Sequence, residues 1–433
     1  MHHIVSLLFI IEFILIVLIC FFLLFKEGVS FKVGISFAVL YFIFIPVFVM
    51  IFTGTLPLSL ADFGATDLNH IVLQNNIKNS FILLAFIFSI ILYLYFPLLK
   101  HKNSSQFTFN PTLKIYILIY IIGMSFIFIG SGLFKGGNWY DNRHDFFESF
   151  GAVALLLAFI LNSSKILIIG SLFYKWLNNQ ISFIKFIVFV SVFTIIDMFL
   201  SGNRIYLFCT FSLIGLIILK KYTKKTLLYT PVIVPSIFMF GYFASIFKHM
   251  RGPLFYYGFP SFQIFLDALK RAINLEPPNP MLFFLGISES VNVNVVYKLL
   301  GNFDNYLYGT TFLKPLFFYL PRSIWASKPE TITIIAAKEY GGASLVTTII
   351  GEMFMNFYLY GLILLPIFLW FIDNILSFAL KKYGDLSKIL MFLFGILIFR
   401  MPFSDEFLVF VFLLLILEFG NFFQNIKFVI KKE

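Results

Sequence analysis

Residues 4–25 read IVSLLFIIEFILIVLICFFLLF, a run of large apolar side chains interrupted only by Ser6 and Glu12. A bilayer core about 30 Å thick is crossed by a helix of about 20 apolar residues. Similar blocks recur along the whole chain of 433 residues, which is 60% hydrophobic and 12% charged. Soluble domains are about one-quarter charged. The composition therefore excludes a soluble enzyme, a disordered chain and a secreted disulfide scaffold, and it predicts an all-α polytopic membrane protein.

The apolar blocks predict about eleven transmembrane helices, within a range of about 10–12. Because the blocks are continuous, an outer-membrane β-barrel is not expected. Residues 1–246 hold eight spans with short loops, 247–357 form a large external loop, and 358–433 hold three more spans and a tail. Without a basic start or a cleavage site, the first block is expected to be a retained span. The predicted spans cover 4–25, 31–53, 80–99, 113–134, 149–173, 182–200, 204–219, 226–246, 358–380, 386–402 and 407–426.

Lysine and arginine are divided unevenly between the two sides of this topology. One set of alternate loops, together with the C-terminal tail, holds seventeen lysines and no arginine. Since basic residues accumulate on the cytoplasmic side, we expect the C-terminus inside and the N-terminus outside. All six arginines then face the exterior, where bidentate capture of phosphate is a characteristic role; snorkelling at helix ends is the alternative. They are Arg143, Arg204, Arg251, Arg271, Arg322 and Arg400.

Three short external segments combine charges with aromatic rings or tight turns. The loop after the fourth span places Trp139, Tyr140, Arg143 and Asp145 within seven residues, a mixture suited to gripping sugars, with an interfacial aromatic belt as the alternative. The turn at 201–204 fixes Arg204 near the headgroups, and Asp197 one helical turn below is its expected partner. The last external turn carries Arg400 with Asp405 and Glu406, for which a simple ion pair is the alternative.

The large external loop contains two expected helices. Apolar residues recur at helical spacing over 262–273, which predicts a helix lying along the interface. From Ser344 to Leu380 the chain would form a helix of about 55 Å, too long for one crossing. We therefore expect a break between Asn356 and Gly361, with 344–355 as a short helix at or dipping into the outer leaflet. Glu352 would share a face of that helix with Thr348.

Several motifs are absent from the sequence. It contains no GxxxxGK[ST] phosphate loop and no HExxH motif, and its two cysteines and six histidines are scattered. We therefore expect no metal, no cofactor and no ATP hydrolysis. The net charge of +11 follows from loop asymmetry, so no nucleic-acid partner is expected.

The motifs from about 197 to 361, with the topology of nearly the whole chain, resemble the O-antigen (oligosaccharide repeat unit) polymerases, the Wzy family. The turn Ser201-Gly202-Asn203-Arg204 and the pair Arg251-Gly252 are part of this similarity. The similar residues of the large loop are Pro321-Arg322, Trp325, Lys328-Pro329, Gly341-Gly342, Ser344, Thr347, Gly351-Glu352, Asn356 and Gly361.

The resemblance implies a GT-C-like, metal-independent glycosyltransferase of the bacterial inner membrane. It would move a growing glycan from undecaprenyl diphosphate onto the non-reducing end of a lipid-linked oligosaccharide repeat unit. Membrane lipids and a chain-length regulator protein are the further partners. The implied diphosphate contacts are Arg322, Arg251, Arg204, Arg143, Arg400 and Lys328. The implied base is Glu352, with Asp145 second, and the implied glycan or backbone contacts are Trp139, Tyr140, Tyr308, Trp325, Gly341, Gly342 and Ser344.

Two other functions stay open. An O-antigen ligase is similar in topology, but ligases carry a functional histidine in the external loop, and residues 250–357 contain none. A transporter or flippase for lipid-linked oligosaccharide would place its polar groups near the bilayer midplane. Lys165 and the polar run 162–164 are the only central candidates for that role.

Overall fold

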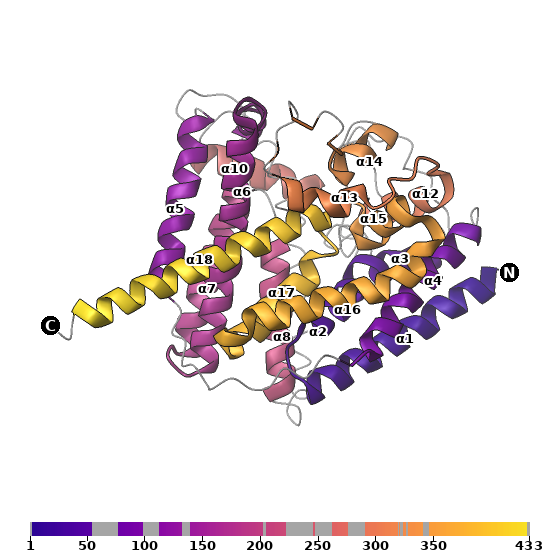
Figure 1. Cartoon of the computed structure of the whole chain (residues 1–433), viewed down its shortest axis with the longest axis horizontal. Helices are drawn as coiled ribbons and strands as arrows, with labels where there is room; N and C mark the ends of the chain where they lie inside the picture. The colour runs from indigo at the N-terminus through magenta and orange to yellow at the C-terminus, as the bar shows by residue number, and fades with distance from the viewer. Residues whose placement is uncertain are drawn as a thin grey trace. The chain divides into compact units, whose positions relative to one another are not determined.

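The computed structural model describes residues 2–53, 77–97, 112–131, 139–201, 205–221, 246, 262–275, 291–318, 320, 324–325, 328–340 and 346–430. Every regular element in these residues is a helix (Figure 1). The chain divides into two compact units. Unit 1 comprises Met1–Phe107 with Pro280–Phe407, and unit 2 comprises Thr108–Asn279 with Leu408–Glu433. Each unit is described by itself.

Seven helices of the described residues are long and apolar enough to cross a membrane. Many of the exposed side chains on these helices are large and apolar, such as Leu18 and Phe22 on the first one. Such an exterior suits lipid rather than water. The chain is therefore an all-helical, multi-pass membrane protein. These candidate spans are Ile4–Lys26, Phe31–Phe48, Ile77–Tyr95, Leu113–Gly130, Val153–Leu177, Thr348–Tyr383, which includes a break described below, and Phe403–Phe423.

The first helices of unit 1 follow the predicted spans closely. α1 covers His2–Lys26, and the span predicted at 31–53 is built from α2 (Phe31–Val39), the π-helix η1 (Leu40–Phe44) and α3 (Ile45–Thr53). Pro46 lies in the first turn of α3 and has no N–H to donate, so the wider π-helical turn before it is the expected adjustment. α4 covers Ile77–Tyr95.

The later helices of unit 1 begin with α12 (Val291–Asn302), α13 (Thr310–Leu313) and the 3-10 helix η5 (Lys314–Phe317). α14 covers Ile332–Tyr340 and α15 covers Thr348–Phe357. The 3-10 helix η6 (Tyr358–Tyr360) separates α15 from α16 (Gly361–Leu380). η7 (Lys381–Tyr383) and α17 (Asp385–Leu397) follow. α18 covers Phe403–Ile430, and the division between the units falls after Phe407 within it.

The break predicted between Asn356 and Gly361 is confirmed. Tyr358 ends α15 with φ 52° and ψ −136°, a backbone conformation that no continuing helix adopts. The chain then begins a new helix of 20 residues at Gly361. The length argument succeeds because the bilayer limits a single straight helix.

Two glycines allow α2 and α17 to pack closely within unit 1. A Cβ atom added to Gly395 would lie 2.5 Å from the carbonyl oxygen of Phe31, and one added to Gly34 would clash with the carbonyl oxygen of Phe392. Small residues of this kind are typical of helix contacts in membranes, where close backbone approach replaces the hydrophobic effect. This contact joins the N-terminal and C-terminal parts of unit 1.

Unit 2 contains α5 (Leu113–Gly130), α6 (Trp139–Leu177), α7 (Phe183–Ser201) and α8 (Ile205–Lys221). α6 is kinked at Gly151, whose φ is 48°; a residue with a side chain rarely adopts this conformation. α10 (Phe262–Leu275) confirms the helix predicted at 262–273. Ser163 of α6 donates a hydrogen bond of 2.7 Å to the carbonyl of Val409 in α18, which fixes the C-terminal helix to this unit.

The structure leaves the finer topology as a prediction. Of the predicted span 226–246, only residue 246 is described. The expected segment 344–355 is helical from Thr348 onward, and residues 341–345 lie outside the described part of the chain. The count of eleven spans, the division at 246 and 357, and the sidedness of the loops therefore remain expectations.

Candidate functional site

A polar face runs along the short helix α15 in unit 1. Thr348, Glu352 and Asn356 are spaced four residues apart, which places them on one side of an α-helix. They expose only 2%, 1% and 1% of their surface. A fully buried carboxylate is rare in any protein unless it is paired or hydrogen-bonded. This face is therefore the strongest candidate site in unit 1.

The Glu352 carboxylate is held by one donor on each oxygen. The Thr311 hydroxyl of α13 donates to Oε1 at 3.0 Å, and the Phe403 backbone N–H donates to Oε2 at 2.8 Å. The N–H of Phe403 is at the first residue of α18, where a helix leaves its amides without intrahelical partners. Each carboxylate oxygen has two lone pairs. Glu352 thus retains acceptor capacity on both oxygens.

Asn356 extends this network by one residue. Its side-chain amide donates to the Thr311 hydroxyl oxygen at 2.8 Å and to the backbone carbonyl of Glu352 at 2.8 Å. The Thr311 hydroxyl accordingly accepts from Asn356 and donates to Glu352, which fixes its proton between them. The network connects α13, α15 and the start of α18.

Further charged groups surround Glu352. Glu406, in the first turn of α18, exposes 5% of its surface and interacts electrostatically with Glu352. Asp405 and Lys314 also act electrostatically on Glu352. Arg400 is half-buried in the turn that leads to Phe403. Two buried carboxylates with basic groups nearby are an arrangement that acid–base chemistry uses.

Three buried side-chain oxygen atoms of α15 and the first turn of α18 have no hydrogen-bond partner among the described residues. They are Thr348 Oγ1, Asn356 Oδ1 and Glu406 Oε2. Each buried polar group without a partner needs an explanation, because leaving it unbonded costs free energy. Two of the three atoms can only accept hydrogen bonds. The site is therefore suited to a ligand rich in donors, such as one with several hydroxyl groups.

The backbone is strained at both ends of α15. Thr348 has φ 57° and Tyr358 has φ 52°, values that are unfavourable for any residue with a side chain and most unfavourable for a β-branched one. Strain of this kind persists only where the surroundings enforce it, and it collects at functional sites. Tyr308, one of the predicted glycan contacts, has φ 48° and is 84% exposed.

The structure describes other predicted site residues of unit 1. The Lys328 ammonium donates to the carbonyls of Phe318 and Leu320, each at 2.8 Å, so it stabilises the end of η5. Trp325 is half-buried, with its ring 5.9 Å from that of Phe317. The contact of these side chains with a substrate stays a prediction.

The remaining predicted site residues are not described in full. Trp139, Tyr140, Arg143 and Asp145 belong to the first turns of α6 in unit 2, and their side chains lie outside what the structure describes. Arg271, which was assigned no site, is exposed on α10. Those entirely outside the described residues are Arg204, Arg251, Arg322, Gly341, Gly342 and Ser344.

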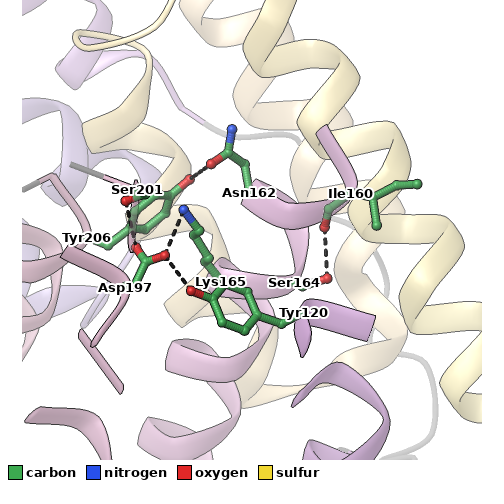
Figure 2. Close-up of polar contacts among 8 residues, drawn as sticks. All are labelled: Tyr120, Ile160, Asn162, Ser164, Lys165, Asp197, Ser201 and Tyr206. Atoms are coloured by element: carbon green, nitrogen blue, oxygen red, sulfur yellow. Dashed lines mark hydrogen bonds and ion pairs between the residues drawn. The ribbon is translucent and has the colours of Figure 1, made fainter. Parts of the chain in front are cut away.

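Unit 2 contains a second buried polar cluster (Figure 2). Asp197 lies 2.8 Å from the Lys165 ammonium, accepts a hydrogen bond of 2.9 Å from the Tyr120 hydroxyl, and accepts one of 3.4 Å from the Ser201 hydroxyl. The sequence predicted Arg204 as the partner of Asp197. In the described part of the chain, Lys165 has that place.

The sequence indicates Glu352 as a candidate site residue but does not indicate most of the residues that contact it. Thr311 is 41 residues from Glu352, and Phe403 is 51 residues away, so no local pattern announces either contact. The four-residue spacing from Glu352 to Asn356 was readable from the sequence. The pairing of Lys165 with Asp197 was not, since the two residues belong to different helices and no local spacing connects them.

The described residues hold no group of three or more His, Cys, Asp or Glu side chains that could bind a metal ion. Comparisons of this chain with protein-family models, with curated proteins and with solved structures found no match.

Proposed function

We propose that this protein is a polysaccharide polymerase of the O-antigen type, similar to the Wzy family. It would transfer a growing glycan from undecaprenyl diphosphate to the non-reducing end of a lipid-linked oligosaccharide repeat unit. The observation that carries the proposal is the Glu352 carboxylate, which is fully buried, hydrogen-bonded on both oxygens and close to a second carboxylate. A glycosyl transfer of this kind requires such a group to take a proton from the attacking hydroxyl.

The proposed step can be written with its atoms balanced. The acceptor hydroxyl gives its proton to Glu352, and its oxygen forms a bond to the anomeric carbon of the donor glycan. The bond from that carbon to the diphosphate oxygen breaks, and undecaprenyl diphosphate leaves with the electron pair. No nucleotide is needed because the glycosyl–diphosphate bond supplies the driving force. This agrees with the missing phosphate-loop motif.

The polar atoms around Glu352 support an acceptor rich in hydroxyl groups. Asn356 Oδ1 and Glu406 Oε2 are buried acceptors without a partner among the described residues. A sugar presents donors in several directions, and a site built to bond them discriminates strongly against molecules that lack them. The exposed aromatic side chain of Tyr308 adds a surface on which a sugar ring can pack.

In this proposal the arginines bind the diphosphate groups of the lipid-linked substrates. Arg322 and Arg251 are the first choices, followed by Arg204 and Arg143, with Arg400 near the Glu352 network. Fixed cations stabilise the charge that the leaving diphosphate gains, and a single well-placed donor is worth about 3–4 kcal/mol of the barrier. The restriction of all six arginines to the predicted external loops supports this assignment.

The proposal includes a location and a topology. The protein would lie in the bacterial inner membrane with about eleven spans in a GT-C-like arrangement. Its N-terminus would lie outside and its C-terminus in the cytoplasm, as the distribution of lysine indicates. The substrates are then reached on the outer face, where lipid-linked repeat units are presented. A chain-length regulator protein is the expected partner.

The test is reconstitution of the purified protein with undecaprenyl-diphosphate-linked repeat units, in the presence of EDTA and without nucleotide. Glycans longer than one repeat unit are expected. A protein that moves single units across the vesicle membrane without lengthening them would be a transporter, and one that attaches glycan only to a lipid A core would be a ligase. Either result would replace the proposal.

Arg322→Lys tests the diphosphate assignment in cells. Lysine keeps the charge but loses the planar fork that binds phosphate through two hydrogen bonds. We expect polymer to disappear while single repeat units still reach the surface and protein levels stay normal. Arg271→Lys, on the exposed face of α10, is the matched control. Normal polymer with lysine at both 322 and 251 would show that the diphosphate role is wrong.

A further inference from the structure

The polar face of α15 holds a buried oxygen atom without a partner on either side of Glu352. Thr348 Oγ1 belongs to the residue one helical turn before the carboxylate, and Asn356 Oδ1 to the residue one turn after it. Both residues expose 2% of their surface or less. Because an unbonded polar atom in the interior costs free energy, each of these atoms requires a donor from outside the described residues.

The orientation of the Asn356 amide is fixed by its other contacts. Its nitrogen lies 2.8 Å from the backbone carbonyl of Glu352, and since a carbonyl oxygen only accepts, the group that faces it must be the NH2 group. The same NH2 group donates to the Thr311 hydroxyl oxygen at 2.8 Å. Turning the amide over would bring Oδ1 against the carbonyl oxygen. Oδ1 therefore stays on the other branch of the amide, where no described residue donates to it.

Asn356 Oδ1 and the Glu352 carboxylate are spaced so that they can bond one molecule. Residues four apart on a helix lie on one face, with Cβ atoms about 5–6 Å apart. Each oxygen of Glu352 accepts one hydrogen bond, from Thr311 or from Phe403, and keeps a further lone pair. The face thus presents two acceptors to a molecule that brings two donors. Two hydroxyl groups of a single sugar ring are such a pair.

Part of the cover must move before a sugar reaches this face, because its side chains are almost completely buried. The cover over Glu352 includes α13, which is only four residues long and contributes Thr311. The two residues before it, Tyr308 and Gly309, have φ of 48° and 79°. A few residues at the end of an element are where hinges usually form. An acceptor can therefore reach the face by displacing one short helix.

We propose that Asn356 is a specificity-determining residue: its Oδ1 atom bonds a second hydroxyl group of the acceptor sugar while the attacking hydroxyl bonds Glu352. The ligand is then a sugar whose attacking hydroxyl has another free hydroxyl on the same ring. A sugar that is deoxygenated or methylated at that second position would leave Oδ1 unbonded and would be a poor acceptor. The inference rests on the proposed function for the kind of ligand, and it adds the residue that selects it.

The test compares acceptors by their kcat/KM. They are the natural undecaprenyl-diphosphate-linked repeat unit and analogues that each lack one hydroxyl of the terminal non-reducing sugar. Besides the analogue without the attacking hydroxyl, we expect one analogue to be about 10–100-fold worse in the wild type. In Asn356→Ala this analogue should come within about 3-fold of the natural acceptor, because the oxygen that distinguishes them is gone. A general loss of stability lowers both values alike, so their ratio reports recognition.

Asn374→Ala is the matched control for this ratio. Asn374 is also buried, and its amide donates to the carbonyl four residues earlier, that of Trp370, at 2.7 Å. It should keep the wild-type ratio. A wild type that lengthens every analogue with a free attacking hydroxyl equally well would overturn the proposal. So would an Asn356→Ala variant that keeps the wild-type ratio. In either case an ordered water, and no sugar, bonds Oδ1.

A second variant covers the case in which Asn356→Ala does not fold. Asn356→Ser keeps a donor for the Glu352 carbonyl, since a serine within a helix can bond to the carbonyl four residues earlier. It lacks the amide oxygen, so the ratio should fall as in Asn356→Ala. A folded Asn356→Ser variant with the wild-type ratio would overturn the proposal.

A binding measurement separates this inference from the proposed function. If the wild type lengthens no glycan, the proposed function fails, and the Kd values of the natural unit and of each analogue for the detergent-solubilised protein decide instead. A Kd ratio of at least about 10 for one analogue, abolished by Asn356→Ala, would support recognition of a hydroxyl by Asn356. Equal Kd values for all the analogues would overturn it.

Discussion

Glu352 in unit 1 and Asp197 in unit 2 are two carboxylates with almost equal burial and different surroundings. Each exposes 1% of its surface, and each accepts a hydrogen bond from the hydroxyl of a neighbouring helix, Thr311 at 3.0 Å or Tyr120 at 2.9 Å. Asp197 also has the Lys165 ammonium at 2.8 Å. Glu352 accepts instead from the backbone N–H of Phe403. Burial alone therefore does not tell a reactive carboxylate from a structural one.

The second partner distinguishes them in physical terms. If Asp197 took a proton from a substrate hydroxyl, the buried Lys165 ammonium 2.8 Å away would be left without its counter-charge, which is costly. Glu352 accepts hydrogen bonds from two neutral donors, and Glu406 and Lys314 act on it electrostatically, so among the described residues no direct ion pair breaks when it takes up a proton. We accordingly propose Glu352 as the catalytic base and Asp197 as a structural residue, and an experiment can refute either role.

The largest effect is expected for Glu352→Gln. The amide keeps the shape of the side chain but cannot take a proton, so transfer should fall by about 10²–10⁴-fold, the usual contribution of a general base. Tm should fall modestly while the protein still folds, because the amide oxygen can accept from Thr311 but the NH2 group leaves the Phe403 N–H without its acceptor, at a cost of about 1–3 kcal/mol. Glu330→Gln is the control, since Glu330 pairs with Lys338 on an exposed surface. Activity within about 3-fold of the wild type would remove Glu352 from the mechanism.

Asp197→Asn makes the same chemical change at the other carboxylate, and here we expect a lower stability of the folded protein. It leaves the Lys165 ammonium buried without its counter-charge, and breaking one side of such a pair costs about 3–5 kcal/mol. Thermal unfolding in detergent should show a clearly lower Tm, and Lys165→Met in the same chain should restore most of the loss. An unchanged Tm for the single variant would show that the pair is not structural.

A third buried carboxylate, Asp373 of α16, lies between these two cases. It accepts a hydrogen bond of 2.8 Å from Tyr93, while Lys32 donates to the Leu94 carbonyl at 3.1 Å and also to the carbonyl of Phe96. Because the ammonium bonds to carbonyls, Asp373→Asn should cost only about 1–2 kcal/mol. Chemical or thermal denaturation of the Asp373→Asn and Asp197→Asn variants would compare their losses of stability. An equal loss for both would mean that direct contact with lysine does not set the cost.

The sequence predicts those features of the fold that depend on the thickness of the bilayer. The length of each apolar block predicts a membrane span, because the hydrocarbon core has a fixed thickness. A helix from Ser344 to Leu380 would be longer than that thickness, so the sequence also predicts the break at Tyr358. The spacing along the chain predicts that Glu352 shares a helix face with Thr348, whereas its role as the base is implied by the resemblance to the polymerase family. The partners of Glu352 and Asp197 come from other helices, and contacts between distant segments leave no local periodicity to read. Arg204, the partner predicted for Asp197, lies outside the described residues, and Lys165 on the neighbouring helix pairs with Asp197.

The smallest effect is expected for removal of the Thr311 hydroxyl. This hydroxyl donates to Glu352 as the Tyr120 hydroxyl donates to Asp197, so the substitution tests how much such a bond contributes at the proposed catalytic carboxylate. Thr311→Val removes one hydrogen bond to Glu352 and leaves the Asn356 amide with a single acceptor, the Glu352 carbonyl. We expect a loss of about 1 kcal/mol in stability and a decrease in transfer of about 10-fold. Thr311→Ser keeps the hydroxyl and should behave almost as the wild type. If Thr311→Val changes stability alone, with transfer unaffected, the Thr311 bond only packs the helices, and the orientation of Glu352 depends on the Phe403 amide.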